Sequence, residues 1–502
     1  MSRRSAAMTA DIDAQLQTHL LRDDGDEDVC LATYRPSTGS DRTSAVLRRV
    51  ILPRDGERLV HGNASFTGDY LLRGAAEAAA DGCGLAMLHS HPGGRGWQSM
   101  SGPDHDAEQS YARLAHTITG KPLIGFTLGG RDGGWSMRNW TPEGRPEWAE
   151  SVRVVGDCLR VTWNDRLCPP PQLQKTQDRT VSAWGERIQA DLARLWFLVV
   201  GAGSVGLDVA LRLAASGVRH VAVMDFDGVY VVNLDRLIGA TRLDVLLCRS
   251  KVEVALRLMR AAATAASPDL QSLEMSVCTS EGLAAALDYD VIVSCVDRPW
   301  PRAALNGIAY ADLIPVVDGG IGIDAFDDGD GMRNATWRSH VVRPGRPCLS
   351  CNGQLDLGDV QLDKQGLLDD PRYLAAAGRN GQARQNVAAL SASVSASLLA
   401  QVVSLVAAPG GRGEPGPLRY TLSAHWLEHV DATTREGCAF EHVTAAGDRR
   451  HTLTGPHAAA TETAAARAVA RRQLRVRAAA ALARLSDRLA TAARAFATFG
   501  GL

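Results

Sequence analysis

The sequence predicts an α/β protein with two folded units followed by a C-terminal helical arm. The chain has 502 residues, and 45% of them are hydrophobic. This length exceeds that of one ordinary domain. From residue 179 a pattern of strand, glycine turn, helix and strand repeats, as in a doubly wound parallel sheet. The last segment is dominated by alanine and arginine. The expected divisions are a disordered or mobile N-terminus (1–22), a first α/β domain (23–150), a linker (151–178), a second α/β domain (179–445) and the arm (446–502).

Composition excludes several classes of protein. Lys and Arg number 54 against 56 Asp and Glu, a formal charge of −2, so the overall charge gives no reason to expect binding to nucleic acid or an anionic membrane. The ten cysteines are scattered, and the first residues form no apolar signal segment, which indicates free thiols in a reducing cytoplasm. The uncharged stretch 385–411 is long enough to span a bilayer, but its five serines favour a buried helix.

The first unit is expected to alternate strands and helices. Strands are predicted at 29–34 and 48–52, the second ended by Pro53, and an alanine-rich helix at 70–80, ended by Asp81-Gly82. The apolar run 84–88, a helix at 104–116 and a strand at 122–128 follow. Three prolines at 169–171 mark the join to the second unit.

A metal site is predicted where the apolar run 84–88 ends. The run leads into His89-Ser90-His91-Pro92 and then Ser101-Gly102-Pro103-Asp104. Residues two apart on a strand point to the same side, so both imidazoles can reach one ion. Asp104, at the start of the next helix, can supply a third ligand and leave the fourth tetrahedral position for water. Hydrolysis also needs a base, and the acidic residues 26–28 are candidates.

This motif resembles the JAB/MPN (JAMM) metalloprotease family, whose pattern is an upstream glutamate, His-x-His-Pro and Ser-x-x-Asp. Its members cleave after the C-terminal glycine of ubiquitin-like proteins. The resemblance implies zinc ligands at His89, His91 and Asp104, a general base at Glu27, and Ser101 as a stabiliser of the oxyanion. The nine residues between His91 and Ser101 exceed the usual spacing, and the glycine-rich loop 93–96 is expected to absorb the difference. Histidines that only cap a turn, or a metal-free form of the fold, remain alternatives.

A nucleotide site is predicted in the second unit. The strand 198–200 runs into a glycine turn with Gly201, Gly203 and Gly206 and then into a helix. Such glycines let the backbone approach a phosphate held at the helix N-terminus. Asp225 stands 24 residues after Gly201, at the end of the next strand, where a carboxylate can bind ribose hydroxyls.

Residues further along favour a triphosphate over a dinucleotide. Asn233, Arg236 and Lys251 follow the second strand, and cations of this kind neutralise a leaving pyrophosphate. Asp297 ends another apolar strand, 291–296, at the edge where ligands bind, and is well placed to hold magnesium. A domain that binds a nucleotide without reacting it is the alternative.

These residues, in this order, resemble the ThiF/MoeB/HesA superfamily, the adenylation domain of ubiquitin-activating enzymes. The likeness also includes Asp178-Arg179, Trp184-Gly185, Arg302, Asn306 and 314–319, and covers about half the chain. It implies a Rossmann-like fold that uses ATP and Mg²⁺ to adenylate the C-terminal glycine of a ubiquitin-like protein. By this resemblance Asp225 binds ribose, Asn233, Arg236 and Lys251 hold phosphates, Asp297 holds magnesium, and Arg179 reaches the phosphates of the other subunit in a homodimer.

The cysteines predict a structural metal site. Cys348 and Cys351 have a spacing suited to zinc, and the superfamily often has a second such pair downstream. Here Cys438 stands in that region with His442 four residues later, so a Cys₃His zinc site is preferred over free thiols or a degenerate site. The superfamily's thioester-forming cysteine has no counterpart at 352–387. Either an outside nucleophile takes the adenylate, or Cys248 or Cys278 serves, both in unfavourable places.

Together the two sites predict a bifunctional enzyme that matures or removes a ubiquitin-like protein and activates it. A bacterial conjugation system, including antiphage systems, or a sulfur-carrier pathway fits the resemblance. The expected partners are a ubiquitin-like protein ending in Gly-Gly, an E2-like protein or sulfur donor, and a second copy of the chain. Alternatives are a scaffold with an inactive peptidase-like dock, and adenylation of a small peptide. In the arm, the stripe Leu482, Leu485, Leu489 and Phe496 predicts a helix packed on its own protein or on a partner.

Overall fold

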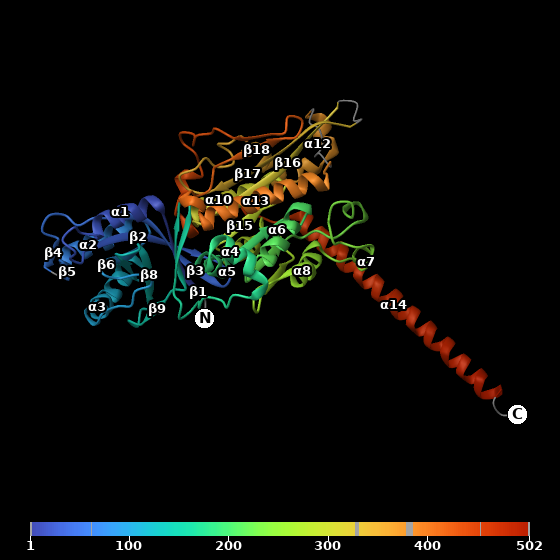
Figure 1. The fold of residues 1–502 in the computed structure, drawn as a ribbon, viewed down its shortest axis with the longest axis horizontal. Helices are drawn as coiled ribbons and strands as arrows, with labels where there is room; N and C mark the ends of the chain where they lie inside the picture. The colour runs from blue at the N-terminus through green and yellow to red at the C-terminus, as the bar shows by residue number, and fades with distance from the viewer. Residues whose placement is uncertain (1–2, 62, 327–330, 378–384, 452, 500–502) are drawn as a thin grey trace.

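The computed structural model describes residues 3–61, 63–326, 331–377, 385–451 and 453–499. Two sheets lie side by side, and one long helix extends away from them (Figure 1). The first sheet contains the N-terminal strands, and the second contains the strands from residue 196 onward. This arrangement agrees with the predicted α/β class.

The first sheet is mixed and has nine strands among the described residues, in the order β11-β10-β1-β3-β2-β6-β7-β8-β9. Helix α1 packs on one face, with Cys30 and Ala32 in its core, and helices α2 and α3 pack on the other, with Leu31. The alternation of these three residues follows from the two-residue period of a strand. The elements are β1 (Arg3–Thr9), α1 (Ala10–Leu20), β2 (Val29–Thr38), β3 (Arg42–Ile51), the hairpin β4 (Arg58–His61) and β5 (Asn63–Phe66), α2 (Gly68–Ala80), β6 (Gly84–His91), α3 (Gly102–Thr119), β7 (Ile124–Gly129), β8 (Gly134–Trp140), β9 (Pro146–Trp148), β10 (Ser151–Val155) and β11 (Leu159–Trp163).

Two predicted boundaries of this unit are wrong. Residues 1–22 were expected to be mobile, but β1 lies inside the sheet, parallel to both β3 and β10, and α1 follows it directly. Residues 151–178 were expected to form a linker, but β10 and β11 lie in that range and belong to the sheet. In both cases a short apolar segment is stabilised by pairing with strands that are remote in sequence, which local pattern does not reveal.

The second sheet has the strand order β14-β13-β12-β15-β16-β17-β18-β19. The first five strands in this order, β14, β13, β12, β15 and β16, are parallel to one another. Strands β17, β18 and β19 run antiparallel to their neighbours. Because β12 is flanked by β13 on one side and β15 on the other, the chain changes direction between β12 and β15, where open α/β sheets bind ligands. The strands are β12 (Trp196–Val200), β13 (His220–Met224), β14 (Asp269–Leu273), β15 (Val291–Ser294), β16 (Val316–Ala325), β17 (Met332–Val342), β18 (Leu418–Thr421) and β19 (Trp426–His429).

Helices cover both faces of this sheet. One core contains α5 (Glu186–Arg194), α6 (Ser204–Ala215), α8 (Lys251–Ala262) and α13 (Ala388–Ala407), and the other contains α9 (Ser280–Ala286) and α10 (Pro299–Ala311). Of the described helices, α13 is long and apolar enough to cross a membrane. Its buried residues Leu390, Val394, Leu398, Val402 and Leu405 pack toward the sheet. The shorter helices are α4 (Asp178–Trp184), α7 (Arg242–Leu246), α11 (Leu357–Lys364) and α12 (Pro371–Ala376).

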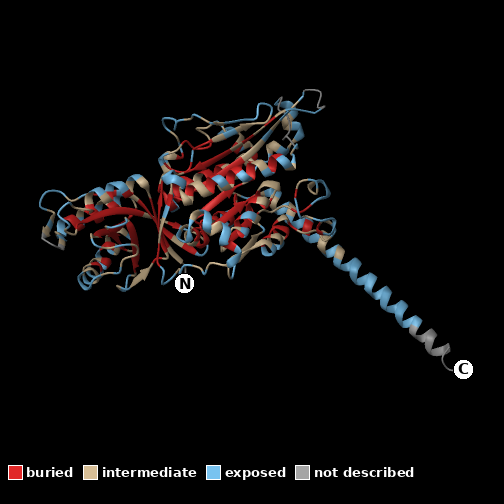
Figure 2. Ribbon diagram, in the orientation of Figure 1, coloured by how far each residue is buried: buried red, intermediate tan, exposed pale blue. Residues whose placement is uncertain are grey.

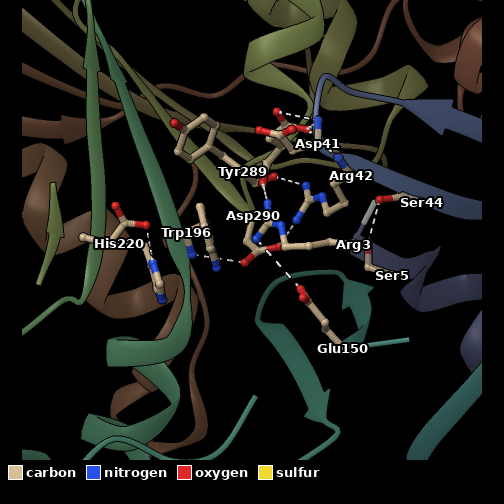
Figure 3. Close-up of polar contacts among 12 residues, drawn as sticks. Arg3, Ser5, Asp41, Arg42, Ser44, Glu150, Trp196, His220, Tyr289 and Asp290 are labelled. Atoms are coloured by element: carbon tan, nitrogen blue, oxygen red, sulfur yellow. Dashed lines mark hydrogen bonds and ion pairs between the residues drawn. The ribbon is translucent and has the colours of Figure 1, made fainter. Parts of the chain in front are cut away.

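The two sheets share a buried junction (Figure 3). The Asp290 carboxylate, after α9, accepts hydrogen bonds from Arg42 Nη1 at 2.5 Å and Arg153 Nη1 at 2.6 Å. Apolar residues of the first sheet, Ala7, Val46 and Val155 among them, lie in the same core as Phe197 of β12. The interface is therefore continuous core rather than a hinge between separate bodies.

Helix α14 (Ala458–Phe499) forms the arm. Figure 2 shows the part of α14 that extends away from the sheets as exposed over its described residues, up to 492. Val476, Leu482, Leu485 and Leu489 are all more than half exposed. The predicted stripe is present on a helix, but its described residues are not packed on this chain; the side chain of Phe496 lies outside the described residues.

Candidate functional sites

The first candidate site is a cluster of three metal-ligand side chains at the end of β6. Asp104 Oδ2 lies 3.5 Å from His89 Nε2 and 3.5 Å from His91 Nε2. One donor atom from each residue lies within 4.8 Å of the other two. The two rings are on the same side of the strand, with centroids 5.0 Å apart. A set of two imidazoles and a carboxylate suits zinc and leaves a coordination position open.

The start of α3 aims Asp104 at the histidines. Ser101 is the N-cap: its Oγ accepts a hydrogen bond from Asp104 N at 3.2 Å, and Asp104 Oδ2 accepts one from Ser101 N at 2.9 Å. This capping box fixes the carboxylate at the first helical turn. Burial acts to raise the pKa of Asp104, but the hydrogen bonds from His89 and His91 outweigh it, and the pKa lies far below the usual range. The exposed Ser101 hydroxyl keeps its own proton to donate.

Strand pairing places Glu27 beside His91. Val29 of β2 is opposite His89 of β6 in an antiparallel register, and Ser90 N donates to Asp28 O at 3.1 Å. Continued two residues beyond the start of β2, this register would bring Glu27 opposite His91 and set the two side chains on one face. Asp104 and, more weakly, Glu27 raise the pKa of His91. Glu27 is thus the member of the acidic group 26–28 whose register position faces the metal ligands.

A buried ion pair lies behind His89 and was not found from the sequence. Thr127 Oγ1 is 3.2 Å from His89 Nε2 and accepts a hydrogen bond from Arg138 Nη1 at 2.5 Å. Arg138 is paired with Glu108, and both are fully buried. These residues hold one side of the ligand cluster in place. Their positions, spread over α3, β7 and β8, give no local sequence signal.

The second candidate site is a cavity of about 1050 Å³ at the carboxyl edge of the second sheet. The glycine turn after β12 forms one wall. Gly201 has φ +95°, and a Cβ there would lie 2.6 Å from Cys295 O; a Cβ on Gly206 would lie 1.8 Å from Gly201 O. A Cβ on Gly203 would meet nothing within 4 Å. Gly201 and Gly206 thus allow other backbone atoms to come close to the turn, which a side chain would prevent. Gly203 leaves free space, so the turn is open toward the cavity there.

Three carboxylates and a lysine face one another in this cavity. Asp225 follows β13; its Oδ2 accepts from Ala202 N and its Oδ1 from Asp227 N, both at 2.7 Å. Lys251 Nζ donates to Asp227 Oδ2 at 2.7 Å. Burial lowers the pKa of Lys251, but Asp225, Asp227 and Asp297 together raise it above its usual value. Asp225 can still accept ribose hydroxyls, because each carboxylate oxygen has two lone pairs, and this acidic set suits a hard divalent cation such as Mg²⁺.

Asn233, Arg236 and Asp297 also line the cavity. Asn233 Oδ1 accepts from Tyr230 N at 2.9 Å, and Arg236 Nη1 donates to Val232 O at 2.6 Å and to Asp235 at 2.8 Å. The predicted nucleotide residues therefore line this cavity, except Gly206, which packs against Gly201 within the turn, and Arg179. Arg179 is exposed on α4 and does not line the cavity; its role toward the other subunit of a dimer stays a prediction.

The cysteine site holds three thiols without the predicted histidine. Cys348, Cys351 and Cys438 have Sγ atoms within 4.8 Å of one another, and Cys348 and Cys438 are 3.7 Å apart. Cys348 Sγ accepts from Cys351 N, and Cys351 Sγ accepts from Arg435 N, as thiolate ligands do in zinc knuckles. The structure does not bring the predicted fourth ligand, His442, to these thiols: it is exposed and is not part of this group. His442 lies in a single helical turn, Glu441–Val443, none of whose residues is buried.

Sequence reasoning also missed one wall of the cavity. Pro456, His457, Ala458, Ala459 and Thr463, from the start of the arm, line it together with the glycine turn. The arm was interpreted from its alanine and arginine content and from the apolar stripe in its second half. A Pro-His pair just before a helix carries no recognised signal for nucleotide binding.

Comparison with known proteins finds similarity within the second unit. The ThiF family model matches residues 176–423. The chain is similar to the molybdopterin-synthase adenylyltransferase of Escherichia coli (strain K12), with 31% identity over 124 residues, 24% of this chain and 47% of that protein. It is also similar to the adenylyltransferase and sulfurtransferase MOCS3 of Anopheles gambiae, with 32% identity over 164 residues, 32% of this chain and 35% of that protein.

More distant similarity extends to a NEDD8-activating enzyme E1 catalytic subunit of Schizosaccharomyces pombe, 27% identical over 128 residues, 24% of this chain and 28% of that protein. The chain spans less than half the length of these curated relatives. Among solved structures, E. coli MccB with AMPCPP and SeMeT MccA aligns with a TM-score of 0.40 and 16% identity, over 53% of this chain and 73% of that one.

Proposed function

We propose that this chain uses ATP to adenylate the C-terminal carboxylate of a small protein, because the ThiF family model matches residues 176–423. The observation that carries the proposal is the cavity in which the glycine turn, Asp225, Lys251 and Asp297 face one another. A site for a nucleoside triphosphate needs room for the phosphates, a cation to neutralise their charge, and carboxylates to bind ribose and magnesium. This cavity supplies each of them.

The reaction transfers an adenylyl group. A carboxylate oxygen of the substrate attacks the α-phosphorus of ATP, the bond from that phosphorus to the α–β bridging oxygen breaks, and pyrophosphate leaves with its electrons. Lys251 and Arg236 stabilise the negative charge that grows on the leaving group. Asp225 orients the ribose, and the amides of the glycine turn fix the phosphates. Magnesium held by Asp297 and a neighbouring carboxylate would supply further charge neutralisation.

We further propose that the substrate is a ubiquitin-like protein and that the first domain hydrolyses extensions beyond its terminal glycine. The cluster of His89, His91 and Asp104, with Glu27 opposite His91, supports this. Zinc bound there would supply Lewis-acid activation of a water molecule. Glu27 takes the proton of that water and passes it to the leaving amine, and the Ser101 hydroxyl donates to the developing oxyanion. One flexible glycine tail then fits both sites.

The adenylate passes directly to an outside nucleophile in this proposal. Residues 352–387 contain no cysteine. Cys278 is buried, and burial raises its pKa to about 12, which leaves almost no thiolate at neutral pH. Cys248 is fixed in a left-handed conformation with φ 52° and lies against Arg471. An amine on a target protein, or a sulfur donor, is the expected acceptor.

The adenylation test is ATP–pyrophosphate exchange with ubiquitin-like proteins that end in Gly-Gly. Exchange is expected with the unmodified chain and is expected to fall about a hundredfold or more in Lys251→Ala. Lys175→Ala, an exposed lysine outside the cavity, is the matched control. Absence of exchange with any such tail, or with small peptides, would contradict the proposal.

The hydrolysis test uses the same protein with a tail extension. Zinc-loaded chain is expected to release the extension, and His91→Ala is expected to abolish release, while His105→Ala, one residue beyond Asp104, retains it. Binding of the ubiquitin-like protein without zinc and without cleavage would instead indicate that the first domain is a docking module.

A further inference from the structure

The start of the arm runs directly over the nucleotide cavity. Residues 453–471, called here the roof segment, pass from the side of α10 to the carboxyl ends of β13 and β14, and five of them line the cavity. Figure 1 shows α14 beginning at the second sheet, close to α6 and α7, before it extends away. The roof segment is therefore part of the cavity wall and is distinct from the exposed part of the arm that extends away.

Contacts on both sides of the cavity hold the roof segment. Before the helix, Gly455 N donates to Cys278 O at 2.9 Å, Trp300 Nε1 to Leu453 O at 2.5 Å, and Lys364 Nζ to Thr454 O at 3.2 Å. Inside the helix, Arg467 is 8% exposed, donates to Phe226 O at 3.1 Å and is paired with Glu274. Arg471 donates to Cys248 O at 3.0 Å and is paired with Glu253. Arg467 is the buried member of these pairs, while Glu274, Arg471 and Glu253 are partly exposed; the contacts to backbone oxygens on both sides of the cavity give the segment its position.

His457 is the aromatic residue that the roof segment adds to the cavity. Its Nδ1 is 2.7 Å from Ser276 Oγ, just beyond β14. Its ring centroid lies 4.9 Å from that of Phe226 at 73° and 5.0 Å from that of Trp300 at 58°. Burial lowers the pKa of His457, so the ring is neutral at pH 7. A neutral, partly buried imidazole beside two aromatic rings is suited to contact a flat heterocycle.

The sheet order indicates where the base of a bound nucleotide lies. Phosphates belong at the glycine turn after β12, and ribose at Asp225 after β13. The base continues in the same direction, away from the turn, toward β14, because the strands follow one another as β12, β13, β14. Phe226 and Ser276 stand at that end of the cavity, and His457 contacts both.

We propose that His457 contacts the adenine base of ATP and that the roof segment is an integral wall of the nucleotide site. The inference rests on the proposed adenylation function and names the part of the chain that recognises the base. It assigns the start of the C-terminal arm, which lies beyond residues 176–423, to the substrate site. Neither of the two sequence resemblances accounts for that assignment.

The experiment separates base from phosphate binding. Calorimetric titration of the full chain with ATP and, separately, with inorganic tripolyphosphate is performed for the unmodified protein, His457→Ala and His457→Phe. His451→Ala, an exposed histidine six residues earlier, is the matched control. Thermal unfolding midpoints confirm that each variant is folded. His457→Phe keeps a ring of similar reach and covers the case in which the alanine variant does not fold.

The expected result is a selective loss of ATP affinity. His457→Ala weakens ATP binding about threefold to tenfold, the range for one aromatic contact, and leaves tripolyphosphate binding unchanged. His457→Phe retains most of the ATP affinity, and His451→Ala has no effect. Equal ATP affinity in His457→Ala and the unmodified chain, or equal losses for both ligands, would overturn the inference while leaving adenylation in place. An unmodified chain that binds neither ligand would overturn the proposed function itself.

Discussion

The junction of the two sheets depends on one buried carboxylate, and replacing it should destabilise the whole chain. Asp290 Oδ1 accepts from both Arg42 and Arg153, and its Oδ2 accepts from Trp196 N at 3.1 Å. Asp290 and Arg42 are 2% exposed and Arg153 is fully buried. Within the described residues, Arg153 Nε and Nη2 have no hydrogen-bond partner. In Asp290→Asn two buried guanidinium groups therefore lose the carboxylate that is hydrogen-bonded to both of them.

The expected cost is about 3–5 kcal/mol of unfolding free energy, the range for removing one partner of a buried ion pair. A pH dependence gives a second measure. Burial alone would raise the pKa of Asp290, but Arg42 and Arg153 outweigh it and lower the pKa from 3.8 to about 2. The carboxylate thus stabilises the fold above about pH 4, and this contribution, about 2 kcal/mol, is lost as the pH falls through 2.

Urea denaturation followed by tryptophan fluorescence measures the effect, because Trp196 lies at the junction beside Arg3 and His220. The control is Asp324→Asn, which removes an exposed pair with Arg333 at 2.7 Å and is expected to cost less than about 1 kcal/mol. Adding Arg42→Met and Arg153→Met to Asp290→Asn should restore much of the stability, because an apolar core replaces uncompensated charge. Equal midpoints for Asp290→Asn and Asp324→Asn would refute the reasoning.

Three further predictions concern the sites. Gly206→Ala should raise the Kd for ATP at least about tenfold, because the added Cβ would lie 1.8 Å from Gly201 O and force the turn to shift; calorimetry measures it. Cys438→Ser should remove one equivalent of zinc, measured by elemental analysis, whereas His442→Ala should remove none. Glu27→Gln should keep zinc at the His89 cluster while hydrolysis of a tail-extended substrate falls about a hundredfold or more; parallel loss of zinc would instead make Glu27 a ligand.

The fold was predictable where the signal is local. The glycine turn at 201–206 and the apolar strand before it predict β12 and α6 because both elements and the turn between them are contiguous in sequence. β1 could not be predicted in the same way. Ala6, Ala7 and Met8 are too few to suggest a strand until β3 and β10 pair with them on both sides, and those partners lie far along the chain.

The sites follow the same rule. His89, His91 and Asp104 share one strand end and the next helix start, so their spacing predicts their geometry. His442 was placed by its spacing from Cys438, but spacing does not fix the direction of a side chain after a turn. His457 reaches the cavity only because α14 begins there. In sequence it is separated from the glycine turn that ends at Gly206 by the rest of the second domain, so no local pattern connects the two.

Continuity of the core between the two sheets decides how the two proposed activities can cooperate. Val46, Val155 and Phe197 share one apolar cluster, so a hinge motion that brings the sites together would expose that core. Figure 1 shows α3 and β6 at one end of the molecule and α7 with the base of α14 toward the other. A trimmed tail must therefore leave the first site and rebind at the second.

Because the two sites are separated, a mixture of two variants, each lacking one site, should carry out both reactions. If both proposed activities hold, His91→Ala is expected to lack hydrolysis and retain adenylation, and Lys251→Ala is expected to have the reverse defect. Mixed in equal amounts, they should convert a tail-extended substrate to adenylate as fast as the unmodified chain at the same concentration of each active site, because the intermediate diffuses freely in both cases. Pyrophosphate release from the extended substrate measures this rate. A clear advantage for the unmodified chain, persisting when free mature substrate is added as a competitor, would mean that the tail passes between the sites without release.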